Sequence, residues 1–479
     1  MSASTEQEWL KNLIGRFGRA DRRREFNFTA GPVNAIPLSD AEVAAVVRSD
    51  DIGRALVAPV LAALLRFSLL LFLPLRSAGI VWRTWLRRAR GAPRTSHALT
   101  VLSLGPQTAS KDAYFSALLD NMGQPFNYVK IVGGRETDTR DFVFVERNLS
   151  LFTAFFLPWR AIVAPVIFLL HLLTGLHHFS GRKEKLLFLL LGLREINGGA
   201  AFNNKVICLS FVAHLKRCKP GSFLFPLEGR NWEKVIMAGA GVLGIQGMGY
   251  LHCAITPRHL SLRHPERFYR AEEIPSSVIA PGEMAFDLFS QNSTWKNIRQ
   301  GYFLRGSRKN ADAKTEIQRD NVVFALTGNL AEGEHILQYM AKLQSATKLK
   351  AIARMNPNTS SFPHLRAYAQ QLGLTLYSPQ EHVRPVMCIY RSSSVAIDCL
   401  KEDIAPIYLQ LEEIVSHNIF ELDNQYRLET IAMDQNFNDK VEVLAEKYGT
   451  SPIVNGAKIA NHYLDQSFSA VELYKLLSK

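Results

Sequence analysis

The chain has 479 residues, a formal net charge of +13, 47% hydrophobic residues and 21% charged residues. A domain takes about 100 to 200 residues, so the length predicts two or three domains. The composition is typical of a folded globular chain and excludes a largely disordered or polytopic membrane protein. The five cysteines show no CxxC pair and no metal-ligand spacing. We therefore expect reduced core thiols in a cytosolic protein, and the N-terminal stretch lacks the pattern of an export signal.

The positive charge is concentrated at the front of the chain. Residues 1–100 contain 15 Lys or Arg against 8 Asp or Glu, a difference of +7. One cluster is formed by Arg22, Arg23 and Arg24, and a second mixes Trp82 and Trp85 with Arg83, Arg87, Arg88 and Arg90. Arginine and tryptophan beside apolar runs favour a lipid interface over nucleic acid. Residues 1–95 are thus predicted to be a basic, helical lead-in that associates with an anionic membrane surface, and we expect no nucleic-acid partner.

Two apolar stretches are candidates for membrane-spanning segments. Residues 55–75 are interrupted by Arg66, whereas residues 161–179 contain no Lys, Arg, Asp or Glu but include Pro165. If both crossed a membrane, the strand and helix between them would be separated from the rest of their domain. We therefore expect helices that lie in or dip into one leaflet. A true span of 161–179 and a buried core helix are the alternatives.

After the lead-in, short strands alternate with helices. Strands are expected at 97–104 and 126–132 with a helix between them, and the pattern resumes after an apolar insert at 151–195. It continues with a helix at 200–218, a strand at 223–226, a helix from Trp232, strands at 242–250 and 278–280, and a helix from Glu283. This alternation predicts a parallel α/β sheet. A polar stretch at 305–320 is typical of a linker, so the first Rossmann-like domain is placed at 96–310.

A second alternation follows the linker and is the clearest in the chain. The expected strands are 321–326, 348–353, 373–377, 386–389 and 404–409, with helices at 334–343, at 364–372 and from Ser392. The second Rossmann-like domain is placed at 311–422, and residues 423–479 are predicted to be helices. The fold class is therefore α/β with two Rossmann-like domains.

The strongest motif of the second domain is a run of serines after a buried strand. Ser392, Ser393 and Ser394 open an apolar helix that contains Asp398. Hydroxyls and free backbone N–H groups at a helix N-terminus favour phosphate, although an ordinary serine cap has the same pattern. The run resembles the Ser-Ser-x-Ala-x-Glu signature in the donor domain of GT-B glycosyltransferases, which face two Rossmann-like domains across a cleft. Thr327, Gly328 and Asn329 resemble the donor-phosphate loop of that family, and also fit a common turn.

The second strand of this domain ends in Arg354-Met-Asn-Pro357. Members of the family that use CMP- or CDP-linked donors carry Lys-x-His-Pro at this place. Arg354 matches in charge, whereas Asn356 replaces the histidine. Asparagine can hydrogen-bond a phosphate but cannot carry a proton near neutral pH.

In the first domain, Glu228 and His252 each follow a predicted strand. The surrounding Leu227-Glu-Gly-Arg-Asn-Trp-Glu233 and Gly249-Tyr-Leu-His252 resemble the Glu-Gly-x-x-Trp-Glu and Gly-Tyr-Gln-His segments of bacterial capsule and O-antigen biosynthesis proteins, with Leu251 in place of Gln. A glutamate at this position could deprotonate an acceptor hydroxyl, with His252 nearby. Alternatively, Glu228 caps the next helix or pairs with Arg230, His252 is structural, and Glu233 pairs across the helix start.

The resemblance implies transfer of a sugar from a nucleotide-activated donor, such as a CMP- or CDP-linked one, to a lipid-linked or surface glycan acceptor. It implies no metal and no cofactor, and a position at the cytoplasmic face of the inner membrane, peripheral or monotopic. The alternatives are a CDP-glycerol-type glycerophosphotransferase and a catalytically degenerate GT-B scaffold subunit of a polysaccharide assembly complex. The sequence leaves the oligomeric state open.

Overall fold

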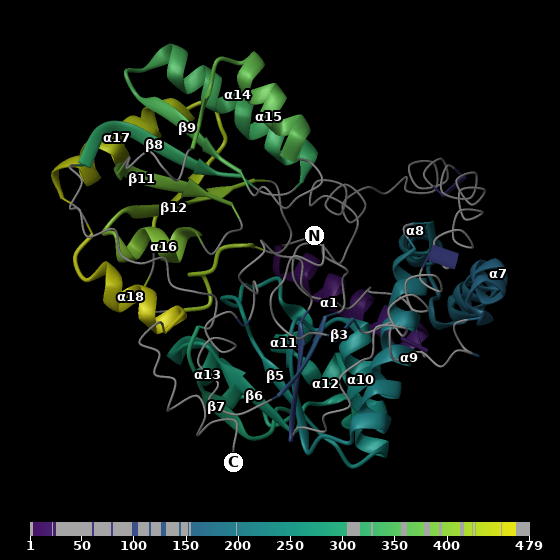
Figure 1. Cartoon of the computed structure of the whole chain (residues 1–479). Helices are drawn as coiled ribbons and strands as arrows, with labels where there is room; N and C mark the ends of the chain where they lie inside the picture. Colours follow the sequence, from purple (N-terminus) through teal and green to yellow (C-terminus); the bar gives the residue numbers. More distant parts are fainter. Residues whose placement is uncertain are drawn as a thin grey trace.

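A computed structural model gives the architecture in terms of two parallel β-sheets, each with helices on both faces (Figure 1). The structure describes residues 3–21, 23–24, 60–61, 78–79, 98–103, 115, 126–130, 143–144, 152, 155–197, 199–303, 317–326, 329–355, 362–377, 384–391, 395–411, 416–423, 425–426, 428–451 and 453–465.

The first sheet has the strand order β3-β2-β1-β4-β5-β6-β7, and its paired strands are parallel. Its strands are β1 (Leu99–Ser103), β2 (Asn127–Lys130), β3 (Val143–Phe144), β4 (Ser222–Pro226), β5 (Gln246–Tyr250), β6 (Ser277–Ala280) and β7 (Ile298–Gln300). The helices α9 (Ala200–Cys218), α10 (Asn231–Val242) and α13 (Glu283–Ser290) belong to this domain. The central strands β1 and β6 are buried at every position, and β4 and β5 at every position but the first, as expected for a parallel sheet covered by helices.

The second sheet repeats the pattern with the order β10-β9-β8-β11-β12-β13. Its strands are β8 (Ile317–Ala325), β9 (Lys350–Arg354), β10 (Thr375–Leu376), β11 (Arg384–Tyr390), β12 (Ala405–Gln410) and β13 (Thr430–Ala432). The helices α14 (Leu330–Ala346), α15 (Phe362–Gln371) and α17 (Phe437–Thr450) share one core cluster, in which the rings of Tyr339 and Phe437 are 5.4 Å apart, whereas α16 (Val395–Lys401) belongs to a different cluster. Numbered within its own domain, this is the Rossmann order 3-2-1-4-5-6.

One prediction for the C-terminal region was wrong. Residues 423–479 were expected to be helices only, yet β13 pairs in parallel with β12, with Leu409 opposite Ile431. A three-residue strand is too short to show a period of two in the sequence, so only the sheet edge that receives it reveals it.

The last described helix, α18 (Gly456–Tyr463), joins the two domains. A Cβ atom at Gly456 would lie 2.0 Å from the carbonyl oxygen of Leu400 in α16, and one at Gly282 would lie 2.5 Å from the carbonyl oxygen of Tyr463. Asp465 then bridges the end of β6 and the segment after β7, since its N–H donates to Pro281 and its carbonyl accepts from Phe303, both at 2.6 Å. The chain thus returns from the second domain to the first.

The N-terminal helix α1 (Ala3–Ala20) is part of the first domain's core. Its apolar side chains Leu10, Leu13, Ile14 and Phe17 are buried, and the ring of Phe17 packs against Phe179 at 5.5 Å. The apolar face of α1 therefore contacts protein, and the prediction that the lead-in faces a membrane does not hold for this helix. Most of residues 25–95 lie outside the described residues.

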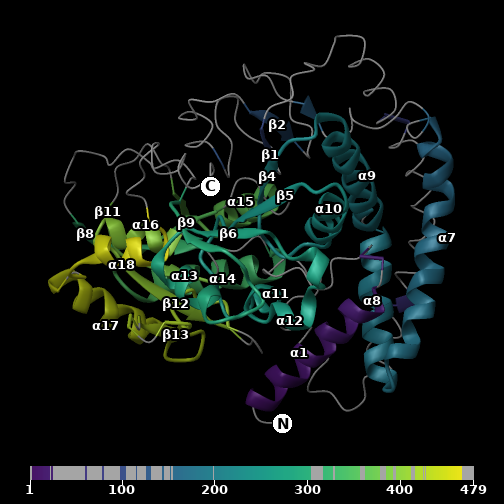
Figure 2. The ribbon, with the colours of Figure 1, turned by 90° about the horizontal axis from the view of Figure 1, so that it is seen from below.

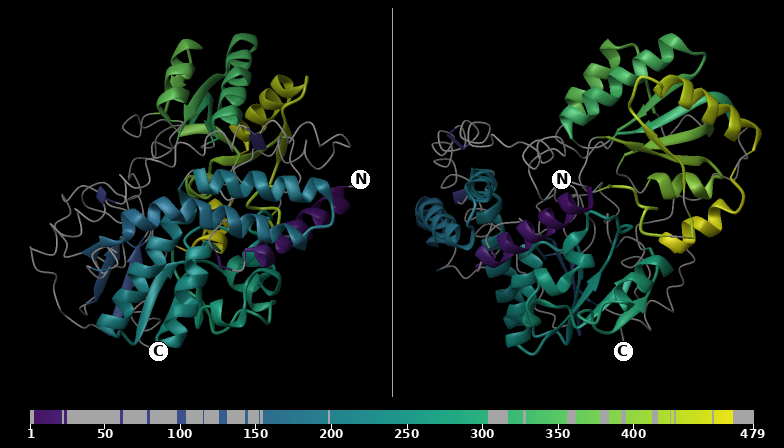
Figure 3. Two further views of the ribbon diagram at one scale, coloured as in Figure 1. Left: turned by 90° about the vertical axis from the view of Figure 1, so that its right-hand side faces the viewer. Right: turned by 180° about the vertical axis from the view of Figure 1, so that it is seen from behind.

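The apolar insert forms α7 (Leu157–Gly175), the short η3 (Leu176–His178) and α8 (Arg182–Asn197). In Figure 2, α7 is the outermost layer, and α8 and α9 lie between it and the helix α10 beside the sheet. Figure 3 shows the same flank from the side, with α1 next to α8.

Candidate functional site

Glu228 and His252 meet at the carboxyl edge of the first sheet. The strands β4 and β5 are neighbours, with Pro226 opposite Tyr250, so Glu228 and His252 each lie two residues beyond a paired position. His252 Nε2 is 3.2 Å from Glu228 Oε1, and the Glu228 side chain is 5% exposed. A second ion pair joins Glu228 Oε2 to Arg230, which confirms one of the alternatives for Glu228.

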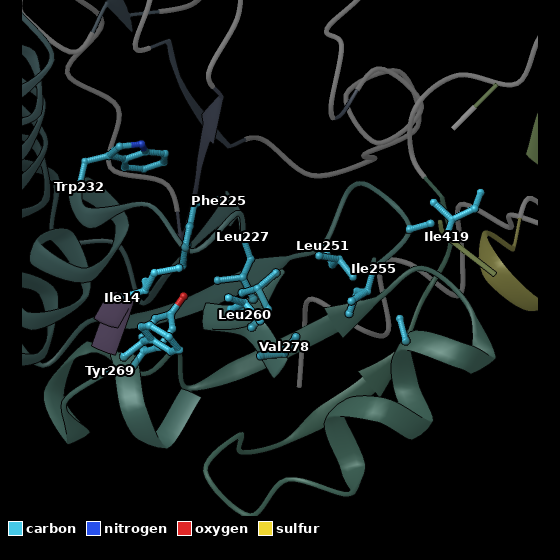
Figure 4. Packing of buried hydrophobic residues seen from close by; sticks show 14 of the residues in the cluster. Ile14, Phe225, Leu227, Trp232, Leu251, Ile255, Leu260, Tyr269, Val278 and Ile419 are labelled. Carbon is cyan, nitrogen blue, oxygen red and sulfur yellow. The ribbon is translucent and has the colours of Figure 1, made fainter. Parts of the chain in front are cut away.

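Apolar neighbours hold both residues in place. Leu227 and Leu251, which precede Glu228 and His252, point into the core among Leu260 and Val278 (Figure 4). The N–H of Leu227 donates to the carbonyl oxygen of Tyr250 at 2.7 Å. Leu251, which stands where the resembled family has glutamine, is fully buried and adds no polar group to the site.

Glu228 does not cap helix α10, whose N-cap Arg230 makes no side-chain capping hydrogen bond, and Glu233 instead holds the loop before the helix. From the first turn of that helix its carboxylate accepts the backbone N–H of Glu228 at 3.1 Å and of Gly229 at 2.9 Å. Gly229 has φ +78°, and a Cβ there would lie 2.4 Å from Ser261 Oγ, so this turn needs glycine. Burial, and secondarily the charge of Glu228, raises the pKa of Glu233 to about 8, although the N–H donors favour its charged form. The expected structural role of Glu233 is thus found as a clamp on the Glu228 loop.

Beneath this loop lies a buried network that ties in the N-terminal helix. Arg24 pairs with Glu273 through two hydrogen bonds of 2.9 and 2.8 Å. Lys234 Nζ lies 4.6 Å from the ring centroid of Tyr269, and burial lowers the pKa of Lys234 to about 7. Arg24 was expected in a basic cluster at a lipid surface, but it is buried in this network, and its partner Glu273 lies 249 positions away in the sequence.

In the second domain, several predicted donor residues lie outside the described residues, namely Thr327, Gly328, Asn356, Ser392, Ser393 and Ser394. The strands that precede them are described and are neighbours. Ala325 of β8 is paired with Tyr390 of β11 and with Arg354 of β9. The strand order reverses direction between β8 and β11, and ligands of such sheets bind beyond the carboxyl ends at this switch point.

The three predicted donor residues that are described have different surroundings. Asn329 is the N-cap of α14, and its side-chain oxygen accepts the N–H of Glu332 at 3.2 Å. Arg354 ends β9 with its guanidinium 5.1 Å from the ring centroid of Tyr377. Asp398 lies half-buried in α16.

A polar chain that the sequence analysis missed connects the two sheets. Arg258, in the segment after β5, contacts Nε2 of His417, in the segment after β12. The N–H of His417 donates to the hydroxyl of Tyr408 at 3.1 Å, and the fully buried Arg391 donates to the same hydroxyl. Arg391 immediately precedes the three serines. It could have been chosen as a candidate from the sequence, because it is an arginine at the end of an apolar strand.

Because Arg258 and His417 both follow carboxyl ends of strands, their contact shows that these edges of the two sheets face each other. The architecture therefore consists of two Rossmann-like domains whose sheets face each other at these edges. The C-terminal helix α18 returns from the second domain to the first. The chain has a GT-B fold. Among the described residues, no group of three or more His, Cys, Asp or Glu side chains is arranged to hold a metal ion.

No family model and no curated protein matches the chain. Solved structures are similar over most of it. MurG of Acinetobacter baumannii has 10% identity and a TM-score of 0.41, covering 80% of this chain and 99% of that one. The lipopolysaccharide outer core galactosyltransferase WaaB has 10% identity and a TM-score of 0.43 (79% and 99%), and a putative UDP-N-acetylglucosamine 2-epimerase of Listeria monocytogenes has 10% and 0.47 (80% and 95%). Likeness at this level does not carry a substrate, a reaction or site residues to this chain.

Proposed function

We propose that the protein is a glycosyltransferase that moves a sugar from a nucleotide-activated donor to a lipid-linked or surface glycan acceptor. The observation that carries this proposal is the buried Glu228 carboxylate, held 3.2 Å from His252 at the sheet edge that faces the second domain. A buried carboxylate with fixed partners at the carboxyl edge of a Rossmann-like sheet is suited to act as a general base.

In the proposed reaction, Glu228 takes the proton of an acceptor hydroxyl as that oxygen forms a bond to the anomeric carbon of the sugar. The bond from this carbon to the donor phosphate breaks, and the nucleotide leaves with the electron pair. His252 holds the Glu228 carboxylate in position, and the clamp from Glu233 fixes the backbone of the same loop. Positioning and stabilisation of the leaving phosphate supply the rest of the rate.

The donor is assigned to the edge formed by β8, β9 and β11. The proposed donor residues are Thr327, Gly328, Asn329, Arg354, Asn356, Ser392, Ser393, Ser394 and Asp398. Hydroxyls, backbone N–H groups and the Arg354 cation suit a diphosphate, so the proposed reaction needs no metal. A CMP- or CDP-linked donor remains the proposal.

The experiment that tests this function compares E228Q with E266Q. Glu228 is buried, whereas Glu266 is exposed and accepts a hydrogen bond from Asn292 at 3.1 Å. Release of nucleotide from a panel of CMP-, CDP-, UDP- and GDP-linked sugars should fall about 10²- to 10⁴-fold in E228Q, the contribution of a general base. E266Q should retain the unsubstituted rate. Full turnover by E228Q would overturn the proposed role of this carboxylate.

One observation favours a second candidate, a degenerate GT-B subunit that binds nucleotide or glycan without turnover. Leu251 is fully buried where the resembled family has a polar glutamine. The two functions separate in a thermal-shift series, because a nucleotide that binds only the native state raises Tm. Stabilisation by CMP, CDP, UDP or GDP without consumption of any donor sugar would identify the scaffold.

The proposed site of action is the cytoplasmic face of a membrane, where a lipid-linked acceptor is available. The support comes from the sequence and from the apolar helix α7, which is long and apolar enough to cross a membrane.

A further inference from the structure

Helix α7 exposes a continuous apolar face. Seven large apolar side chains with exposed fractions between 41% and 65% project from it, namely Trp159, Ile162, Val163, Val166, Ile167, Leu170 and Leu173. At 100° per residue these positions all fall on one side of the helix. Isolated exposed apolar residues are ordinary on a protein surface, whereas a contiguous patch of this kind marks an interaction surface.

The opposite face of α7 is packed against the protein from one end to the other. Its buried residues are Leu157, Ala161, Ala164, Pro165, Phe168, Leu172 and Gly175. A Cβ atom at Gly192 of α8 would lie 2.1 Å from Leu172, and one at Gly175 would lie 2.9 Å from Phe188. These close approaches fix α7 antiparallel to α8, whose Phe188 and Leu191 belong to the core.

This packing decides between crossing a membrane and lying along it. A span would require lipid or another spanning helix around α7 over the roughly 30 Å of the hydrocarbon core. The neighbour α8 begins Arg182-Lys-Glu-Lys185 and cannot follow α7 into a bilayer without desolvating these charges. Since the inner face of α7 is buried against α8 and α9, only its outer face is free to meet lipid.

The charges next to this face are complementary to an anionic surface. The chain has no Asp or Glu between Glu146 and Glu184. Arg160 at the start of α7 and Arg182 at the start of α8 are exposed, and Trp159, 65% exposed, is of the type that prefers the level of the lipid headgroups. An apolar strip with arginines at its ends fits the boundary of an anionic leaflet better than it fits a second protein surface.

We propose that α7 is an in-plane membrane anchor whose outer face enters one leaflet of an anionic membrane, while its inner face stays on α8. The inference deepens the membrane location proposed above and does not depend on the transfer reaction. It places the first domain directly on the lipid surface and leaves both ends of α7 on the same side of the bilayer.

Vesicle binding by the full-length chain tests the anchor without any donor or turnover. The double variant V166E/L170E places two charges on the outer face of α7, and V443E/V454E places two at positions that are at least as exposed, 64% and 77%, on the far domain. With phosphatidylcholine vesicles containing phosphatidylglycerol, the affinity of V166E/L170E should fall at least about tenfold. V443E/V454E should bind as the unsubstituted chain does, and all three should keep the same Tm. Equal binding by V166E/L170E and the unsubstituted chain, or no binding by the latter, would overturn the proposal.

Two further measurements separate the anchor from a span and from a protein interface. In sealed vesicles, a membrane-impermeant maleimide added outside should label R160C and S180C alike, above the background of the unsubstituted chain. Labelling of only one of them would show a helix that crosses the bilayer. A second outcome would also overturn the proposal: the unsubstituted chain is a dimer in solution, the V166E/L170E variant is a monomer, and the two bind vesicles equally. The outer face of α7 would then be an interface with a second copy of the chain.

Discussion

His252 Nε2 lies 3.2 Å from Glu228 Oε1 because each residue stands two positions beyond a matched pair in adjacent strands. The buried sheet fixes this register, since a slip by one residue would turn every side chain of a strand to the opposite face. The geometry of this pair therefore depends on the packing of β4 and β5 more than on the loops themselves.

Replacement of His252 by Asn should lower turnover while the fold is kept. The loss of a hydrogen bond worth about 1.4 kcal/mol in the transition state corresponds to roughly tenfold in kcat. The matched control is H364N, which removes a histidine from an exposed pair with Glu334 at 2.7 Å. Steady-state kinetics should show the loss in kcat rather than in KM for H252N only. An unchanged kcat in H252N would remove His252 from the site.

The clamp formed by Glu233 gives a prediction for stability. In E233L no side-chain oxygen remains to accept the backbone N–H groups of Glu228 and Gly229, so these buried donors lose their partner. The free energy of unfolding should fall by about 1 to 3 kcal/mol. Urea denaturation measures this, and a change below 0.5 kcal/mol, roughly the effect of an ordinary surface substitution, would contradict the clamp.

The destabilisation caused by replacing Glu233 should depend on pH. The pKa of Glu233 is raised from 4.5 to about 8 in the folded chain. Between these values the folded state binds more protons than the unfolded state, so this group stabilises the fold fully below pH 4.5 and loses its contribution as pH rises through 8. The destabilisation by E233L should therefore be largest in mild acid and should shrink toward pH 8. A destabilisation that grows with pH would contradict the direction of the shift.

Gly229 should not tolerate a side chain. In G229A the methyl group meets Ser261 Oγ, and the backbone is held at φ +78°, a left-handed conformation that costs an L-residue about 1 to 2 kcal/mol. We expect at least this loss in the free energy of unfolding, measured by denaturation. G241A is the control, because its Cβ would meet nothing within 4 Å and alanine is favoured over glycine within a helix.

The buried pair of Arg24 and Glu273 anchors the N-terminal segment. R24M would leave the Glu273 carboxylate buried without its guanidinium partner, and breaking such a pair costs about 3 to 5 kcal/mol. R267M breaks an exposed pair with Glu8 of α1 and should cost no more than about 1 kcal/mol. Limited proteolysis, together with urea denaturation, should show release of α1 in R24M only. Equal behaviour of the two variants would show that the buried pair does not hold α1.

By itself the sequence determined the local elements and the places where chemistry is expected. Apolar strands such as β4 and β11 and the helices between them follow from periodicity and turn residues, and Glu228 and His252 could be chosen because each follows such a strand. The short strand β13 was not predicted, because three residues are too few to show a hydrophobic period.

Only the tertiary structure decided which of these positions meet. The clamp by Glu233, the pair of Arg24 and Glu273, and the contact of Arg258 with His417 join segments whose side-chain chemistry gives no hint of a partner. For α7, the apolar composition fitted a core helix, a span and an in-plane helix equally well. The packing of one face on α8 and the exposure of the other carry the proposal of an in-plane helix, because hydrophobicity is a property of each residue, whereas burial depends on what the rest of the chain places beside it.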